Sequence, residues 1–242
     1  MGTAGTGQLL VSGRLFQYRT FTHELGHELD LAHTVTIDER NGVSLTDPYE
    51  QYRGLASSEV VESLFSGVVY GQAWDSMAVH PHGYNAAARE ALGWLGPHNV
   101  INAYHEQAIT LTSIDAAQND EVRVLRVPIN ENAAYVFEAR TFDHVNPDDI
   151  GAEHNRSLKD VIDGGLAAVT VWVELKESLT ANWILRGPHY LSIPGATKYD
   201  EHYDAGETFR DIFHGIEVEF SNATTSSVDA TLRFIDPFPY TP

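Results

Sequence analysis

The chain has 242 residues, enough for one large domain or two small ones, and 43% of them are hydrophobic, which favours a folded core over disorder. Its formal net charge is -19, from 34 acidic and 15 basic residues, so its surface repels nucleic-acid phosphates and we expect no nucleic-acid partner. Cysteine is absent, which excludes disulfides and thiolate ligands and leaves histidine and carboxylates for any metal. No apolar run reaches the length of a membrane span.

Helix signals dominate the part of the chain before Pro97. Phe21–Leu31 is expected to form one helix. A second is expected over Ala86–Leu95, with Asn85 as its N-cap and the Gly-Pro pair at 96–97 as its stop. A short helix is expected over Glu59–Phe65.

After Pro97 the pattern changes to short strands between turn signals. Several of these segments alternate apolar and polar residues, as a strand with one buried face does. The predicted strands are Ala108–Leu111, Val122–Val127, Ala134–Ala139, Ala167–Leu175, His189–Ile193, Ile216–Phe220 and Val228–Phe234. This spacing of strands predicts an antiparallel β-sandwich over residues 98–242.

The sequence HELGHELDLAH, from His23 to His33, carries the candidate chemistry. His23 and His27 are four residues apart, so on a helix both imidazoles point to one side and can bind one ion. Glu24 lies one step round the helix, within reach of a metal-bound water. His33 can reach the same ion only if the chain turns sharply after His27. A chance helix with histidines on one face is the alternative, and the third histidine argues against it. We predict zinc ligands at His23, His27 and His33 and a general base at Glu24.

This stretch resembles the metzincin signature H-E-x-x-H-x-x-G-x-x-H, with Asp30 where the pattern has glycine. Tyr70–Ala78 resembles the Met-turn region of the gametolysin-like and immune-inhibitor-A-like secreted peptidases. In those families an aromatic-Asn-Ala segment and an L-G-W segment follow, and Tyr84–Ala86 and Leu92–Leu95 fill these places. The resemblance covers Phe21–Leu95 and is weaker downstream.

The resemblance implies a secreted zinc metalloendopeptidase that acts on protein or peptide substrates. It implies that Met77 forms an apolar floor beneath the zinc and is not a ligand. It also implies an α+β fold, in which a helix-rich metzincin-like zinc half, residues 1–97, precedes the β-sandwich of residues 98–242. Only 22 residues precede His23, so we expect the upper sheet of this catalytic region to be largely missing and the region to be N-terminally truncated.

Two questions stay open: the role of one pair of downstream residues, and the function of the chain as a whole. The segment around Tyr135 resembles a Y-x-x-E-x-R strand of those families, which makes Glu138 and Arg140 either active-site residues or, as we favour, a surface cross-strand pair. The whole chain is alternatively a non-catalytic cell-surface or carbohydrate-binding β-sandwich module attached to a truncated, inactive zinc site. The intact Glu24 argues against that alternative, because a structural zinc site needs no base.

Overall fold

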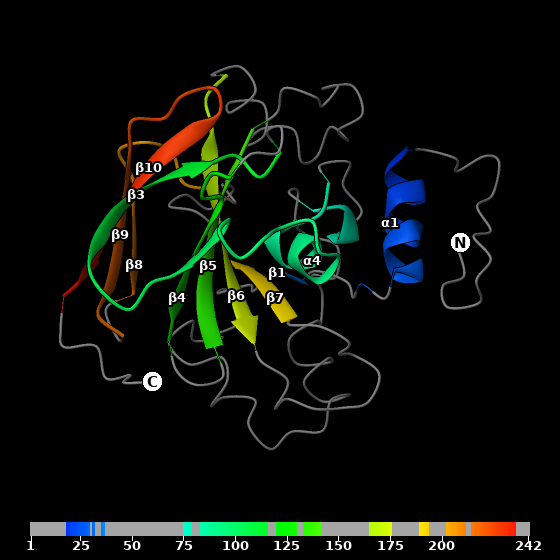
Figure 1. The fold of residues 1–242 in the computed structure, drawn as a ribbon, viewed down its shortest axis with the longest axis horizontal. Helices are drawn as coiled ribbons and strands as arrows, with labels where there is room; N and C mark the ends of the chain where they lie inside the picture. The colour runs from blue at the N-terminus through cyan, green and yellow to red at the C-terminus, as the bar shows by residue number, and fades with distance from the viewer. Residues whose placement is uncertain are drawn as a thin grey trace.

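The structure is a computed structural model of the chain, and it describes residues 18–29, 31, 35–36, 75–78, 83–115, 120–129, 133–141, 165–175, 189–193, 202–211 and 214–235. These residues form ten strands, two α-helices and one short 3-10 helix (Figure 1). No helix in this part of the chain is long and apolar enough to cross a membrane.

Six strands form a mixed sheet at the centre of the molecule (Figure 1). The inner strands pair antiparallel, while β1 pairs with β7 and β2 pairs with β4 in parallel. In spatial order the strands are β1 (Val35–Thr36), β7 (His189–Ile193), β6 (Ala168–Leu175), β5 (Ala133–Arg140), β4 (Val124–Pro128) and β2 (Val100–Asn102).

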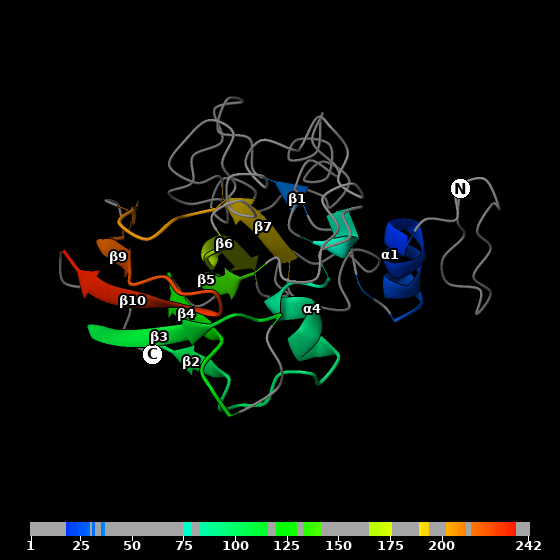
Figure 2. The same ribbon diagram turned by 90° about the horizontal axis from the view of Figure 1, so that it is seen from above.

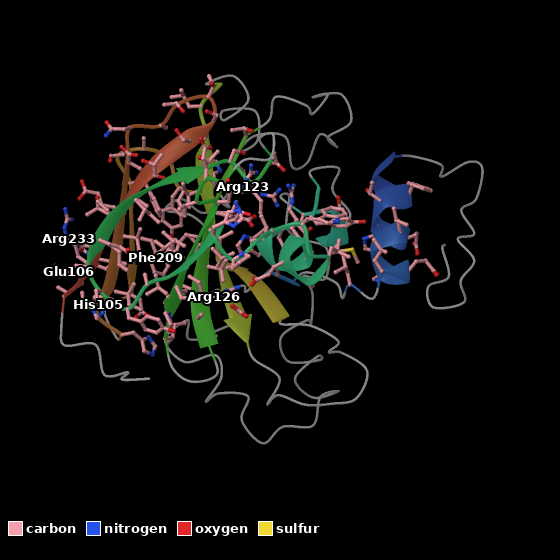
Figure 3. All side chains as sticks on the ribbon, viewed as in Figure 1. His105, Glu106, Arg123, Arg126, Phe209 and Arg233 are labelled. Carbon is pink, nitrogen blue, oxygen red and sulfur yellow. The ribbon has the colours of Figure 1, made fainter. Side chains whose placement is uncertain are left out.

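Four further strands form an antiparallel sheet that packs against one face of the mixed sheet. In spatial order they are β3 (Gln107–Thr112), β10 (Ser227–Phe234), β9 (Ile216–Ser221) and β8 (Thr208–Asp211). Their burial alternates, as in Ile216–Ser221, because successive side chains of a strand point to opposite faces. Apolar side chains from both sheets fill the space between them, and Figure 3 shows Phe209 there.

The central strand β5 shows how the two faces of the mixed sheet differ. Tyr135 and Phe137 point into the core between the sheets, where their rings lie 4.8 and 5.2 Å from that of Phe209. Val136 points the other way and belongs to a second core with Trp172 and two alanines of α4. One strand therefore connects the antiparallel sheet on one side with the helical layer on the other.

Helices α1 (Tyr18–Glu28) and α4 (Ala86–Ala91) lie on this second side, with α4 nearer the sheet (Figures 1 and 2). Asn85 is the N-cap of α4, as predicted, and its side-chain oxygen accepts the N–H of Ala88 at 2.9 Å. The helix ends before the predicted Leu95, because Gly93 takes a left-handed conformation with φ of 72°. The N–H groups of residues 93 and 94 close this end on carbonyls of the last turn, which is a Schellman motif.

The predicted fold class, a helix-rich metzincin-like half followed by an antiparallel sandwich, is wrong. The described residues are rich in strand, and those before Pro97 include β1, which extends the mixed sheet beside β7. Both edges of that sheet are parallel pairs. A two-residue edge strand such as Val35–Thr36 leaves no periodic signal, and a short motif determines a helix and a turn without determining the architecture around them. The division into domains at residue 97 stays a prediction, as does the helix at Glu59–Phe65, which lies outside the described residues.

Candidate functional site

Helix α1 carries three of the predicted site residues, His23, Glu24 and His27. The helix ends at Glu28, and the N–H of Leu31 then bonds back to the carbonyl of Gly26 at 2.9 Å. Such a six-to-one bond reverses the chain direction at a helix C-terminus. The sharp turn that the His27-to-His33 spacing requires therefore begins at the expected place.

The two histidines of α1 hold their rings in a fixed orientation. His23 is 6% exposed and His27 is partly buried, and their ring planes are nearly perpendicular at 87°. His23 Nδ1 lies 3.0 Å from the carbonyl oxygen of Ser76, and His27 Nδ1 lies 3.0 Å from that of Leu31. A carbonyl oxygen only accepts hydrogen bonds, so each Nδ1 donates, and in the neutral form of each ring Nε2 then presents a lone pair.

These two Nε2 atoms lie 3.2 Å apart. When both rings are neutral, two lone pairs face each other at this distance and repel, and either a shared proton or a shared metal cation removes the repulsion. Nitrogen ligands about 2.0–2.1 Å from a tetrahedral zinc ion are themselves about 3.3–3.4 Å apart. A backbone carbonyl on the outer ring nitrogen is also a common arrangement for a metal-ligating histidine. His23 and His27 therefore fit as two nitrogen ligands of one zinc ion.

The protonation of His23 agrees with this role. Burial is the main reason that the pKa of His23 lies below its ordinary value, and it outweighs the hydrogen bond to Ser76, which raises the pKa. The neighbouring His27 lowers it further, while Glu24 raises it. A lowered pKa keeps the imidazole neutral near pH 7, which is the form that binds metals.

The third predicted ligand, His33, lies outside the described residues, as does Asp30. Within the described part of the chain, no group of three or more His, Asp or Glu side chains is placed to hold an ion. Glu24 is partly buried and close enough to His23 to act on its charge. The structure thus brings His23, Glu24 and His27 together and leaves His33 as a prediction.

Met77 lies against the middle of α1. It is in the short 3-10 helix η2 (Ser76–Ala78), it is buried, and it packs in a small core with Tyr84 and Ala88. A side chain at Gly26 would overlap its sulfur atom. Glycine at this position therefore lets Met77 approach the helix between the two histidines, and the place of Met77 beneath a zinc ion stays a prediction.

A segment that includes Ser76, Tyr84 and Asn85 attaches α1 to the rest of the molecule. The Ser76 carbonyl accepts from His23, and the Tyr84 hydroxyl donates to the carbonyl of Thr22 at 2.7 Å. The N–H of Ser76 donates to the carbonyl of Gly83 at 2.8 Å, which closes the two ends of this segment on each other. The position of the histidines thus depends on residues far away in the sequence.

Four charged side chains, two of them buried and two partly buried, form a cluster between α4 and the mixed sheet, and we call them the charge cluster: Arg89, Asp115, Glu138 and Arg140. Glu138 is 0% exposed and Arg140 is 1% exposed, and Arg140 Nε donates to Glu138 Oε1 at 2.8 Å. The expectation of a surface cross-strand pair is therefore wrong. Both residues lie on β5, two positions apart, so they face the same side of the sheet.

The charge cluster joins α4 to the sheet at two points, through the pairing of Arg89 with Asp115 and through the bond from the Ala86 N–H to Glu138. Arg140 Nη1 lies 3.3 Å from Asp115 Oδ1, and Arg89 of α4 pairs with the same carboxylate. Burial by itself lowers the pKa of Arg140, but the carboxylates of Glu138 and Asp115 raise it above its ordinary value. Arg89 and Arg123 both donate to the carbonyl of Ile114 at the edge of the cluster.

Sequence reasoning missed the buried carboxylate of Asp75 as a partner of the site, and it named Glu138 as a candidate only through the resemblance of its strand, while favouring a surface position. Asp75 stands two residues before Met77 in the segment that resembles a Met-turn, and this was the available signal for it. Nothing in the spacing of Glu138 connects it with the histidines, because its partner in the helical layer is 52 residues away.

Comparison with protein-family models finds no match for this chain, and neither curated proteins nor solved structures match it. The resemblance to the metzincins over Phe21–Leu95 therefore stays a prediction from the motifs. What the structure adds is the arrangement of the two imidazole rings of His23 and His27 on α1.

Proposed function

We propose that the protein is a secreted zinc-dependent endopeptidase in which His23, His27 and His33 hold the metal and Glu24 is the general base. The observation that carries this proposal is the pair of Nε2 atoms 3.2 Å apart, each on a ring whose Nδ1 is bonded to a backbone carbonyl. Two histidines that only pack in a core do not require their Nε2 atoms to converge, whereas two ligands of one metal ion do.

In peptide hydrolysis, the histidines of α1 would hold the zinc ion and Glu24 would transfer the proton. Zinc, when bound, lowers the pKa of a coordinated water and polarises the scissile carbonyl. Glu24 accepts a proton as the water oxygen bonds to the carbonyl carbon, and it then gives this proton to the nitrogen of the leaving amine as the C–N bond breaks. The Ser76 and Leu31 carbonyls keep the imidazoles of His23 and His27 in one tautomer and orientation throughout.

Zinc content tests the proposal directly. The full chain, dialysed after purification, should retain about one equivalent of zinc, the ion required by a single three-histidine site. His27→Ala should lose it, because one of the two convergent nitrogen atoms is removed. The matched control is His105→Ala, which changes an exposed histidine on the far side of the molecule from α1 (Figure 3). Full zinc retention in His27→Ala would contradict the proposal.

A further inference from the structure

Two buried carboxylates meet at the N-terminus of α4, and each is 0% exposed. Asp75 accepts from Asn85 twice, from its backbone N–H at 3.2 Å and from its side-chain amide at 3.0 Å. Glu138 Oε2 accepts the N–H of Ala86 at 2.6 Å. The N-cap of α4 is therefore bonded to Asp75, two residues before Met77, and its first residue is bonded to Glu138 of the mixed sheet.

Capping of α4 alone does not account for this arrangement. Asn85 already caps the helix through the N–H of Ala88, and the helix has only six residues. Burying a carboxylate is costly unless it is fully paired, and here two are buried beside one short helix. Their partners connect them, because Glu138 also binds Arg140, and Asp75 contributes to the charge around the same guanidinium.

Two separate links connect these carboxylates with α1, which carries the candidate metal site. Asp75 precedes Ser76 in the chain, and the Ser76 carbonyl accepts from His23 Nδ1. Tyr84 precedes Asn85, and its hydroxyl donates to α1 at Thr22. Ser76 and Tyr84, which hydrogen-bond to α1, are therefore each covalently next to a residue of the Asp75–Asn85 hydrogen-bonded pair.

We propose that Asp75 and Glu138 are positioning residues of the zinc site, which hold the Ser76 carbonyl where it keeps His23 in the Nδ1–H tautomer with its Nε2 directed toward that of His27. The inference rests on the proposed function. Asp75 acts through the backbone of Ser76, and Glu138 acts through Ala86 and the N-cap of α4. Neither side chain touches the metal or the substrate.

The substitutions Asp75→Asn and Glu138→Gln test this in the full chain. Each keeps the side-chain shape but replaces one carboxylate oxygen by an NH₂ group. In Asp75→Asn this group faces an N–H of Asn85, and in Glu138→Gln it faces either the Ala86 N–H or the Arg140 guanidinium. Zinc affinity, measured by competition with a chelator well below the unfolding temperature, should fall about 10–100-fold, the effect typical of outer-shell partners. Long-range proton–nitrogen NMR spectra of the metal-free protein should show that His23 loses its single Nδ1–H tautomer.

Asp211→Asn is the matched control, because it also removes a buried carboxylate but lies in the antiparallel sheet, with Tyr135 and His214 as its partners. It should lower the unfolding temperature and leave zinc affinity and the His23 tautomer unchanged. If Asp75→Asn does not fold, Glu138→Gln alone decides. Wild-type zinc affinity and tautomer in the folded variants would overturn the inference while the proposed function stands. A wild-type chain that binds no zinc would overturn both.

Discussion

His23 and Ser76 are 53 positions apart in the sequence, yet the ring nitrogen of one donates to the carbonyl oxygen of the other. Helical spacing alone predicted that His23 and His27 lie on one side of the helix, and their rings do lie together, while their role as zinc ligands stays a prediction. The sequence could not predict the carbonyl that orients each ring, because backbone acceptors leave no mark in a sequence. It also suggested a surface position for Glu138 and Arg140, since two charges on one strand resemble a solvated face until their buried partners are known.

Glu24→Gln is expected to keep the zinc and lose hydrolysis. The change is nearly isosteric and removes the group that accepts the proton, which contributes about 10²–10⁴ in rate. Cleavage of casein and zinc content are measured on the same sample, with Glu106→Gln, an exposed residue remote from α1, as the control. Casein cleavage at the wild-type rate would show that Glu24 is not the base. Zinc binding without hydrolysis in the wild-type chain would favour the non-catalytic alternative.

Gly26→Ala tests the contact between Met77 and α1, because the two possible effects on stability have opposite signs. Helix propensity alone predicts that alanine stabilises this position by about 1 kcal/mol. The structure predicts the opposite, because the new methyl group overlaps the Met77 sulfur and lies 3.2 Å from the Tyr84 ring. Overpacking of this kind costs about 1–3 kcal/mol. Thermal unfolding should therefore show a lower midpoint than in the wild type, and a raised midpoint would mean that Met77 does not lie where the structure puts it.

At the scale of elements, the strands after Pro97 were predictable because each is an apolar segment between turn signals, and those of the antiparallel sheet also alternate, since only one of their faces is buried. Every strand predicted there overlaps an observed one, as Ile216–Phe220 does with β9. The elements that were missed are short and lie at edges, as β1 and β2 do, or rest on a turn such as Gly93, which ends α4 early. Which strands become neighbours was not predictable, because parallel pairing at both edges of the mixed sheet depends on long connections and leaves no local pattern.

The hairpin of β8 and β9 is tied to the mixed sheet by Asp211. Its Oδ2 accepts from the Tyr135 hydroxyl and from His214 Nδ1, both at 2.6 Å. Burial raises the pKa of Asp211, but the bonds from His214 and Tyr135 outweigh this and hold the pKa below its ordinary value of 3.8. Because the folded-state pKa is depressed, the stabilisation is complete above the unfolded value and is lost as the pH falls through the folded one.

Asp211→Asn should therefore destabilise the protein at pH 7 by about 1.5–3 kcal/mol, the usual size for hydrogen bonds to a charged group. The difference from wild type should shrink as the pH falls below 3.8. Urea unfolding at both pH values measures it, with Asp120→Asn, whose side chain is almost fully exposed, as the control. A difference that is the same at both pH values would show that the carboxylate charge of Asp211 is not what stabilises the hairpin.

At the scale of the whole molecule, the antiparallel sheet, the mixed sheet, α4 and α1 follow one another in that order (Figure 2). Strand β5 is central to this order, because one of its faces packs between the sheets and the other carries Glu138 and Arg140 against α4. The two histidines lie on the outermost of these layers. The contacts that hold α1 come from Ser76 and Tyr84, in the segment that leads into α4, and a short motif carries no information about such contacts.

The claim that His23 and His27 share one zinc ion with a third histidine is tested most directly by X-ray absorption at the zinc edge of the metal-loaded full chain. The account predicts a first shell of nitrogen and oxygen atoms at about 2.0–2.2 Å, with the outer-shell scattering of about three imidazole rings, the ligand set of a catalytic three-histidine site. A shell of oxygen atoms without imidazole scattering would contradict it, because the two Nε2 atoms that converge in the structure would then have no part in binding the metal.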